Sequence, residues 1–444
     1  MNVCCKHGKL YLCFLVFGLI SHLSLAISDN ELNEIKSGLS FADSLITSTQ
    51  QYLFPTFMTG AASAAIGFIS GTLKFVGFIL SFLGTNESQE LLAIKRLYTQ
   101  MDKRFDAVDI QLSAIQKQID WSRLKLQFGD LERNIKSDSI YLKSIYQSPI
   151  ASKESEKDFF IHAWESNCWV CALNLYHGIM GSDVGFSDDI LQVAMTTFEH
   201  NRPLTQTFMT GLFKLLVLSV TNELAYRSIK YPKASYLYQE YIWKQRLCNI
   251  TSRMMKFDET IKNKYHEQAE KDILNFAKAN PTSSLTNEHF SKKLYDFLVQ
   301  KFYWRDWLVI VYKPIRGDAY HNNNVCDGYR KYRTYGRNIV VSSVIQSKIP
   351  INTTEAAFII NSMTTTYQTC SDAPCTHNYN CISVCKSHYY NSMNLFSTLP
   401  KDCAVYASAG VIDSWVDLWY QGLPKRLVQK RTPGSNSYSI HLFG

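Results

Sequence analysis

The 444-residue chain lacks the short motifs that mark common enzymes. It has no glycine-rich nucleotide loop, no Gly-x-Ser-x-Gly elbow and no His-Glu-x-x-His zinc motif. His266 and Glu267 begin like the zinc motif, but Glu270 stands where the second histidine would be needed. A triad assembled from distant residues would leave no such local signature. We therefore predict a protein that is not an enzyme and needs no cofactor.

Charge is nearly absent from one long stretch near the N-terminus. Between Asp43 and Glu87 the only charged residue is Lys74. Water-soluble helices rarely run this far without a polar face. The apolar part, residues 57–84, exceeds the roughly 20 residues that span a bilayer core. The segment is therefore the strongest functional indication in the sequence.

Two side-chain patterns are superposed on this apolar segment. Small residues recur at Ser63, Gly67 and Gly71, a spacing that lets two helices approach closely in lipid. Large residues form a heptad stripe at Ile66, Ile69, Leu73, Val76, Leu80 and Leu83. The segment is either a masked membrane-insertion element or a permanent core helix of a soluble bundle. A permanent transmembrane anchor is disfavoured because Lys74 lies near its middle.

The first 26 residues read as a signal peptide. Lys6 and Lys9 give a basic start, residues 10–20 are apolar, and residues 24–26 form a small-residue cleavage site. A retained signal anchor is the alternative. We expect a secreted, extracellular protein whose mature chain begins near Ile27.

Cysteine content supports secretion. Six of the cysteines lie between 326 and 403, and we predict three disulfides among them. Their spacing lacks the Cys-x2-Cys units of zinc sites, and we expect the Cys168-x2-Cys171 pair to be structural. The mature chain has an odd number of cysteines, so one should be unpaired or bridge to another chain. The nine disulfide candidates are Cys168, Cys171, Cys248, Cys326, Cys370, Cys375, Cys381, Cys385 and Cys403.

Glycosylation sequons and charge agree with an extracellular protein. Candidate glycosylation sites are Asn86, Asn249 and Asn352. Loss of the signal peptide lowers the formal net charge from +8 to +6, which is too diffuse to indicate nucleic acid binding. The basic pairs at 425–426 and 430–431 are interpreted as solvated surface.

The rest of the sequence is mostly helical in pattern up to about residue 303. From residue 304 the pattern indicates buried strands and cysteine-rich loops. The fold class expected is mainly α: a helical bundle with a long apolar helical hairpin, plus a smaller disulfide-bonded α+β C-terminal region. A heptad seam at 94–119 should pack on the apolar segment. Further helices are expected at 157–182, 208–220, 236–278 and 285–301, and strands at 306–312 and 338–345. Four regions are expected. They are a signal peptide (1–26), an apolar hairpin and heptad helix region (27–150), a helical region (151–303) and a Cys-rich α+β region (304–444).

Two passages resemble a known family. One is Met101-Asp-Lys-Arg-Phe-Asp-Ala-Val-Asp-Ile-Gln-Leu-Ser-Ala-Ile-Gln-Lys-Gln-Ile-Asp-Trp121, and the other is Phe302-Tyr-Trp-Arg-Asp-Trp-Leu-Val-Ile-Val-Tyr312 followed by Gly317 and His321. They resemble the cephalotoxin-like secreted proteins of invertebrates and their Rapunzel-type vertebrate relatives, over roughly residues 50–345. The resemblance implies a secreted helical protein, toxin-like in some members, with no catalytic residues to carry over.

The sequence thus favours a secreted, toxin-like, membrane-active protein with a masked insertion segment at 57–84. The alternative is a secreted non-enzymatic interaction or structural protein in which the same segment is a permanent core helix. The partners expected are a lipid membrane, an extracellular protein or a glycan, with oligomers forming on membranes. Nucleic acid is not an expected partner.

Overall fold

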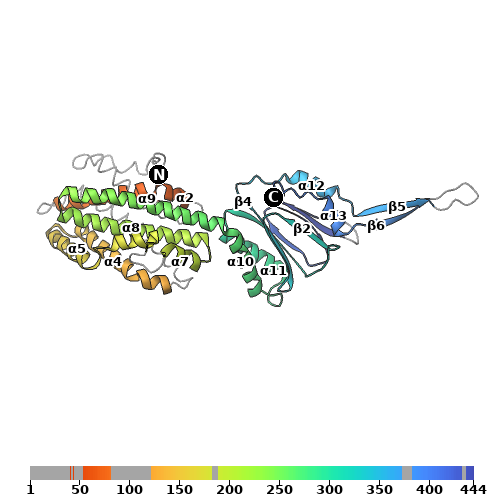
Figure 1. The fold of residues 1–444 in the computed structure, drawn as a ribbon, viewed down its shortest axis with the longest axis horizontal. Coiled ribbons are helices and arrows are strands. Elements are labelled where there is room, and N and C mark those ends of the chain that lie inside the picture. Colours follow the sequence, from red (N-terminus) through yellow and green to blue (C-terminus); the bar gives the residue numbers. More distant parts are fainter. Residues whose placement is uncertain are drawn as a thin grey trace, which may run out of the picture. The chain divides into compact units, whose positions relative to one another are not determined.

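A computed structural model describes residues 41, 44, 54–81, 122–182, 189–372, 383–432 and 437–444. The chain divides into two compact units, Met1–Lys264 and Tyr265–Gly444 (Figure 1). The first is helical and the second combines sheets with helices and disulfides, which confirms the expected fold class. The signal peptide, the 94–119 seam and Asn86 lie outside the described residues. The expected regional boundaries stay predictions.

The helical unit is built around one long helix, α8 (Arg202–Lys230). Its elements are α2 (Phe54–Ser81), α4 (Ser122–Gln147), η1 (Ile150–Ser152), α5 (Lys153–Asn167), α6 (Cys171–Met180), α7 (Ile190–Thr197), α8 (Arg202–Lys230) and α9 (Lys233–Asn263). Pro55 is tolerated because it lies in the first turn of α2. α8 contacts α2, α4, α5, α6, α7 and α9, so it forms the centre of this unit. The predicted apolar helix at 208–220 is its buried middle.

Two stretches predicted as single helices are each divided. The 157–182 stretch forms α5 and α6, because the backbone leaves the helical region at Cys168 and a disulfide joins Cys168 to Cys171. The 236–278 stretch ends its first helix at Asn263. Lys264 follows α9 as its C-cap, and α10 begins at Tyr265, the first residue of the second unit. The Tyr265 hydroxyl donates to the Asp327 carboxylate of the same unit.

The second unit contains two four-stranded antiparallel sheets. The strands are β1 (Arg305–Tyr312), β2 (His321–Val325), β3 (Gly328–Thr334), β4 (Arg337–Ile345), β7 (Ser408–Asp413), β8 (Trp419–Gly422), β9 (Leu427–Arg431) and β10 (Tyr438–Phe443). Their orders are β3-β4-β1-β8 and β2-β7-β10-β9. The helices are α10 (Tyr265–Ala279), α11 (Asn287–Lys301), α12 (Thr353–Asn361) and α13 (Ser392–Thr398).

These elements form four layers, helix–sheet–sheet–helix. β1 shows why: Leu308 and Ile310 face the other sheet, whereas Trp307 and Val309 pack beneath α10 and α11. α12 and α13 cover the outer face of the β2-β7-β10-β9 sheet. Because both faces of β1 are covered, its sequence is a continuous apolar run rather than an alternating one.

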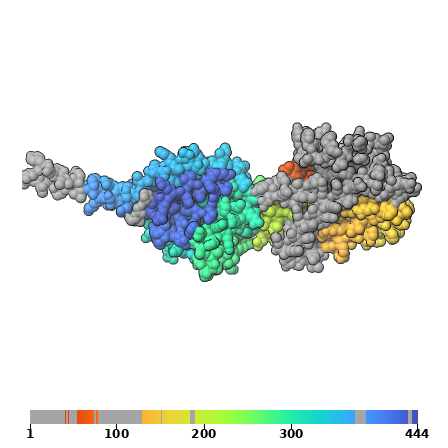
Figure 2. All heavy atoms as spheres, turned by 180° about the vertical axis from the view of Figure 1, so that it is seen from behind, coloured from red at the N-terminus to blue at the C-terminus, as the bar shows by residue number. Residues whose placement is uncertain are grey.

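A two-stranded arm extends from the second unit. It consists of β5 (Thr366–Asp372) and β6 (Ser383–Tyr389), which pair antiparallel. Figures 1 and 2 show it reaching beyond the two sheets of its unit. The disulfide Cys370–Cys385 joins directly opposed residues of the arm.

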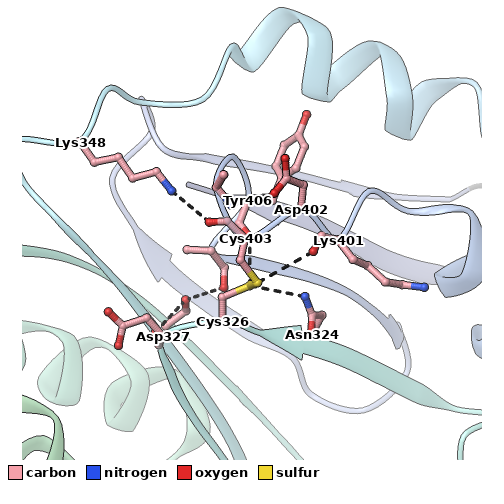
Figure 3. The surroundings of a disulfide bond; sticks show 11 residues. Asn324, Cys326, Asp327, Lys348, Lys401, Asp402, Cys403 and Tyr406 are labelled. Carbon is pink, nitrogen blue, oxygen red and sulfur yellow. Dashed lines mark hydrogen bonds between the residues drawn. A yellow bond between two sulfur atoms is a disulfide. The ribbon is translucent and has the colours of Figure 1, made fainter.

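Two disulfides lie among the six C-terminal cysteines in the described residues. Besides the arm bridge, Cys326 is joined to Cys403, next to the pairing of β2 with β7 (Figure 3). In the chain-entropy view this bridge closes a 77-residue separation and contributes about 4 kcal/mol. Cys375 and Cys381, the predicted third pair, lie outside the described residues. Cys248 is not part of any of the described bridges. The predicted odd cysteine stays a prediction.

The prediction that the basic pair at 425–426 is solvated surface is wrong for Arg426, which is fully buried. Its guanidinium donates to the Asp306 carboxylate at 2.5 Å and to the Lys348 and Gly444 carbonyls at 2.7 and 3.2 Å. A buried cation is stable only when paired in this way. Lys425 remains exposed.

Asp138 in α4 is a buried carboxyl group without a hydrogen bond. Its side chain has no exposed surface, and neither oxygen has a partner among the described residues. Burial raises its pKa from 3.8 to about 7, because the charged form is poorly solvated there. The folded protein keeps this proton up to about pH 7, whereas the unfolded chain loses it near pH 4. Stability should therefore fall as pH rises through this window.

Asp138→Asn is expected to remove this pH dependence. Above pH 7 the variant should be more stable than wild type by on the order of 3 kcal/mol, because the amide carries no charge to bury. Urea unfolding at pH 5 and pH 8 measures the difference. The control is Asp130→Asn, since the Asp130 side chain on the same helix is 84% exposed. An equal effect of Asp138→Asn at both pH values would contradict the explanation.

Candidate functional site

Helix α2 is the candidate functional element, and one face of it is buried in the helical unit. It packs mainly on α8 and α9 and touches α4. An aromatic cluster holds its first half, in which the Phe57 and Phe213 rings lie 6.1 Å apart and the Phe41 and Phe68 rings 5.7 Å apart. The buried apolar residues are Phe54, Met58, Ala61, Ala62, Ala65, Phe68, Ile69, Leu73 and Val76.

The outward face of α2 carries only small and hydroxyl-bearing residues where the structure describes its side chains. These residues follow a four–three spacing as far as Ser70, and Gly77 comes seven residues later, so they form a straight stripe along the helix. The small-residue stripe consists of Thr56, Gly60, Ser63, Gly67, Ser70 and Gly77. Its members are exposed or half-buried, and Figure 2 shows part of α2 in orange-red at the molecular surface.

The predicted site residues divide between these two faces. Ile69, Gly71, Leu73 and Val76 are buried, Ile66, Gly67 and Leu80 are half-buried, and Ser63 is exposed. The predicted small-residue ladder therefore does not stay on one face. Each step of four residues turns the helix about 40° past a full circle, so Gly71 lies about 80° from Ser63.

A polar contact fixes the stripe to its neighbour. The Ser70 hydroxyl donates to Glu240 of α9 at 2.8 Å. Two threonine hydroxyls of α2 instead bond within the helix: Thr59 donates to the Pro55 carbonyl and Thr72 to the Phe68 carbonyl. The Ser70 bond is thus the described side-chain hydrogen bond that ties α2 to another helix.

Two described helices are long and apolar enough to cross a membrane. They are Phe54–Leu73 and Arg202–Lys230, judged by length and composition. The second is 83% buried and the first only 56%. Core helices of soluble proteins pass the same test, so the difference in burial is the informative part. α2 is the less enclosed of the two.

The expected partner of α2, the 94–119 seam, lies outside the described residues. The described partners α8 and α9 were not predicted for this role. α8 could have been identified from its apolar run. α9 is polar over most of its length, and only its occasional large residues, such as the buried Trp243 and Leu247, indicate a packed face.

Two candidate glycosylation sites lie at the surface. Asn249 is exposed on α9. Asn352 is exposed and caps α12, its side-chain oxygen accepting from the Thr354 and Glu355 backbone. The cap uses Oδ1, which leaves Nδ2, the atom that carries a glycan, toward solvent.

One arrangement in the second unit resembles a nucleophile and its base. The Ser408 hydroxyl lies 3.1 Å from His441 Nε2. Both side chains have no exposed surface, and burial lowers the pKa of His441 to about 3. A substrate could not reach this pair in the folded unit, so we interpret it as a polar contact between strands β7 and β10.

Comparison with known proteins finds a match to one family model in the central part of the chain. Residues 84–283 match the family model of the cephalotoxin-like middle helical domain. The match begins just after α2 and ends just after α10, and it contains the passage 101–121. No curated protein and no solved structure matches the chain significantly.

Proposed function

We propose, from the cephalotoxin-like middle helical domain that the chain carries, that it is a secreted, toxin-like, membrane-active protein. In this proposal α2 is a masked insertion segment. It is held against α8 and α9 in the soluble form and enters lipid at a target membrane. Disulfides in both units support secretion, because such bonds persist in oxidising compartments.

The observation that carries the proposal is the incomplete enclosure of α2. Its first 20 residues are apolar enough to span a bilayer, yet little more than half of that stretch is buried. Where the structure describes its side chains, the outward face consists of small residues such as Thr56, Gly60, Ser63 and Ser70. Along its described outward side chains α2 therefore presents a small-residue face rather than an apolar one.

Transfer of α2 into lipid would break few polar contacts. The helix satisfies its own backbone, as any membrane-spanning segment must. Thr59 and Thr72 would keep their hydrogen bonds, because the two carbonyl groups that accept them also lie in α2. Only the Ser70–Glu240 bond is lost among the described side-chain bonds of α2. The transition then exchanges protein contacts for lipid contacts, so a modest free-energy difference could drive it.

Dye release from vesicles tests the proposal. Purified mature protein should release dye from phosphatidylcholine vesicles, alone or mixed with phosphatidylserine, in a concentration-dependent way. Heat-denatured protein is the control for unspecific damage. No release from either vesicle over a wide range of concentration and pH would overturn the proposal.

The alternative is a secreted, non-enzymatic interaction or structural protein with α2 as a permanent core helix. The complete burial of Ile69 and Val76 favours it, since these side chains are already removed from water. The two functions differ in one respect only, which is whether α2 leaves α8 and α9.

A further inference from the structure

Three connections of the second unit meet at one end of its sheets. The pairs Tyr312↔Asn338 and Val311↔Trp419 place the end of β1 beside the starts of β4 and β8. The pair His321↔Ile412 places the start of β2 beside the end of β7. The β1–β2 loop, the β3–β4 turn and the β7–β8 turn therefore share one end of the unit.

This end presents exposed aromatic rings. Trp415 in the β7–β8 turn is 64% exposed, and Tyr320 in the β1–β2 loop is 46% exposed. Their loops are joined, because the Asp413 amide donates to the Tyr320 carbonyl at 2.8 Å. Tyr332 and Tyr335, at the end of β3 and in its turn, are also exposed. We call Tyr320, Tyr332, Tyr335 and Trp415 the aromatic end.

The β5–β6 arm is rooted at the aromatic end. The Ser392 amide, just after the arm, donates to the Ala319 carbonyl at 3.0 Å, and its hydroxyl donates to the Asp318 carbonyl. The arm adds two more exposed tyrosines, Tyr367 and Tyr389. Figure 1 shows the arm extending away from the two sheets.

Basic side chains surround the rings. They are exposed, and within the described part of the chain none of them forms an ion pair. They come from the β1–β2 loop, from the end of β3 and from the end of β9: Lys313, Arg316, Arg333 and Arg431.

Fewer carboxylates offset these cations. Asp318 is exposed in the β1–β2 loop. Asp417 is already engaged, because its two oxygens accept from the Trp419 indole at 2.9 Å and from Asn287 at 3.1 Å. Asp413 is half-buried. The side chains around the aromatic end therefore carry a net positive charge, and an acidic partner fits this surface.

We propose that the aromatic end binds an acidic glycan, a sulfated or sialylated oligosaccharide. The rings of Trp415 and Tyr320 would stack on the C–H faces of the sugars, which rigid aromatic side chains do at little entropic cost. Arg316 and Arg333 would pair with sulfate or carboxylate groups, for which the guanidinium fork is suited.

The residue types favour a glycan over a bilayer. Surfaces that enter lipid combine basic residues with Trp, Phe and Leu. Here the rings are mainly tyrosines, whose hydroxyls need polar partners. The exposed aliphatic residues Ile349 and Val405 lie elsewhere, near the opposite end that holds the Cys326–Cys403 disulfide. This binding surface is separate from α2 and does not depend on insertion.

Calorimetric titration of the full mature protein tests the proposal. The probes are a heparin-derived hexasaccharide and sialyllactose, with desulfated hexasaccharide and lactose as neutral counterparts. At least one acidic probe should bind, and its neutral counterpart should bind at least tenfold more weakly. Trp415→Ala should weaken binding at least tenfold, and Arg316→Gln with Arg333→Gln should do the same. Phe358→Ala is the matched control, because Phe358 is 73% exposed on α12.

Four outcomes would overturn the glycan surface. They are no binding of either acidic probe at millimolar concentration, equal binding of the neutral probes, unchanged binding by Trp415→Ala, and equal weakening by Phe358→Ala. Loss of binding to phosphatidylserine vesicles in Trp415→Ala, without any glycan binding, would assign the surface to lipid instead. Tyr335→Ser serves as a second variant if Trp415→Ala fails to fold. Dye release from glycan-free vesicles is measured separately, so failure of insertion and failure of glycan binding are distinguishable.

Discussion

Ile69→Asp is expected to unfold the helical unit. The Ile69 side chain has no exposed surface and lies on the face of α2 that packs on α8 and α9. The substitution removes a buried apolar side chain and places a carboxylate in its position. Together these changes should cost more than about 4 kcal/mol, a large part of the stability of a typical domain. Urea unfolding followed by far-UV circular dichroism measures the loss.

Ser63→Asp provides the matched control on the same helix. Ser63 is exposed on the small-residue stripe, so its carboxylate would remain in water. The free energy of unfolding of this variant should lie within about 1 kcal/mol of the wild-type value. If Ile69→Asp were as stable as Ser63→Asp, α2 would not be part of the core and the proposed masking would fail.

The elements that the sequence predicts well are those with a strong local pattern. The run at 306–312 is apolar at nearly every position, and it forms β1 between two covering layers. The apolar segment forms α2 because nothing in it after Pro55 interrupts a helix. In both cases the nearest neighbours along the chain contain the information.

Long-range pairing explains what the sequence leaves open. Arg426 reads as a surface charge beside Lys425, and only the approach of Asp306 and the Gly444 carbonyl makes it a buried residue. The four-layer arrangement likewise depends on strands far apart in sequence, such as β2 with β7. Neither partner is visible in a local window.

Long-range packing also decides which residues of the candidate site face outward. The sequence shows that the α2 segment contains many small residues. It does not show which of them share one face, because Ser63, Gly67 and Gly71 are only one of several possible sets. Which small residues face outward depends on where α8 and α9 lie. Gly71 is buried against the unit, whereas Gly60 and Gly77 are exposed and complete the stripe instead.

Gly60→Leu and Gly77→Leu should abolish dye release without loss of the soluble fold. A Cβ at either position would meet no atom within 4 Å, so the soluble unit has room for a side chain. Replacing glycine within a helix also favours the helix by roughly 0.8 kcal/mol. In lipid, helices that associate through small residues need close backbone approach, which leucine prevents. Release and unfolding are measured on the same preparations.

Gly60→Ala and Gly77→Ala are the controls, because alanine is small enough to keep close helix packing. They should release dye like wild type. Gly71→Leu cannot separate the two effects, since Gly71 is buried and a larger side chain would strain the soluble core. Full dye release by Gly60→Leu and Gly77→Leu would mean that α2 does not associate through its outward stripe. Loss of release in the alanine variants as well would assign the effect to altered helix stability rather than to packing in lipid.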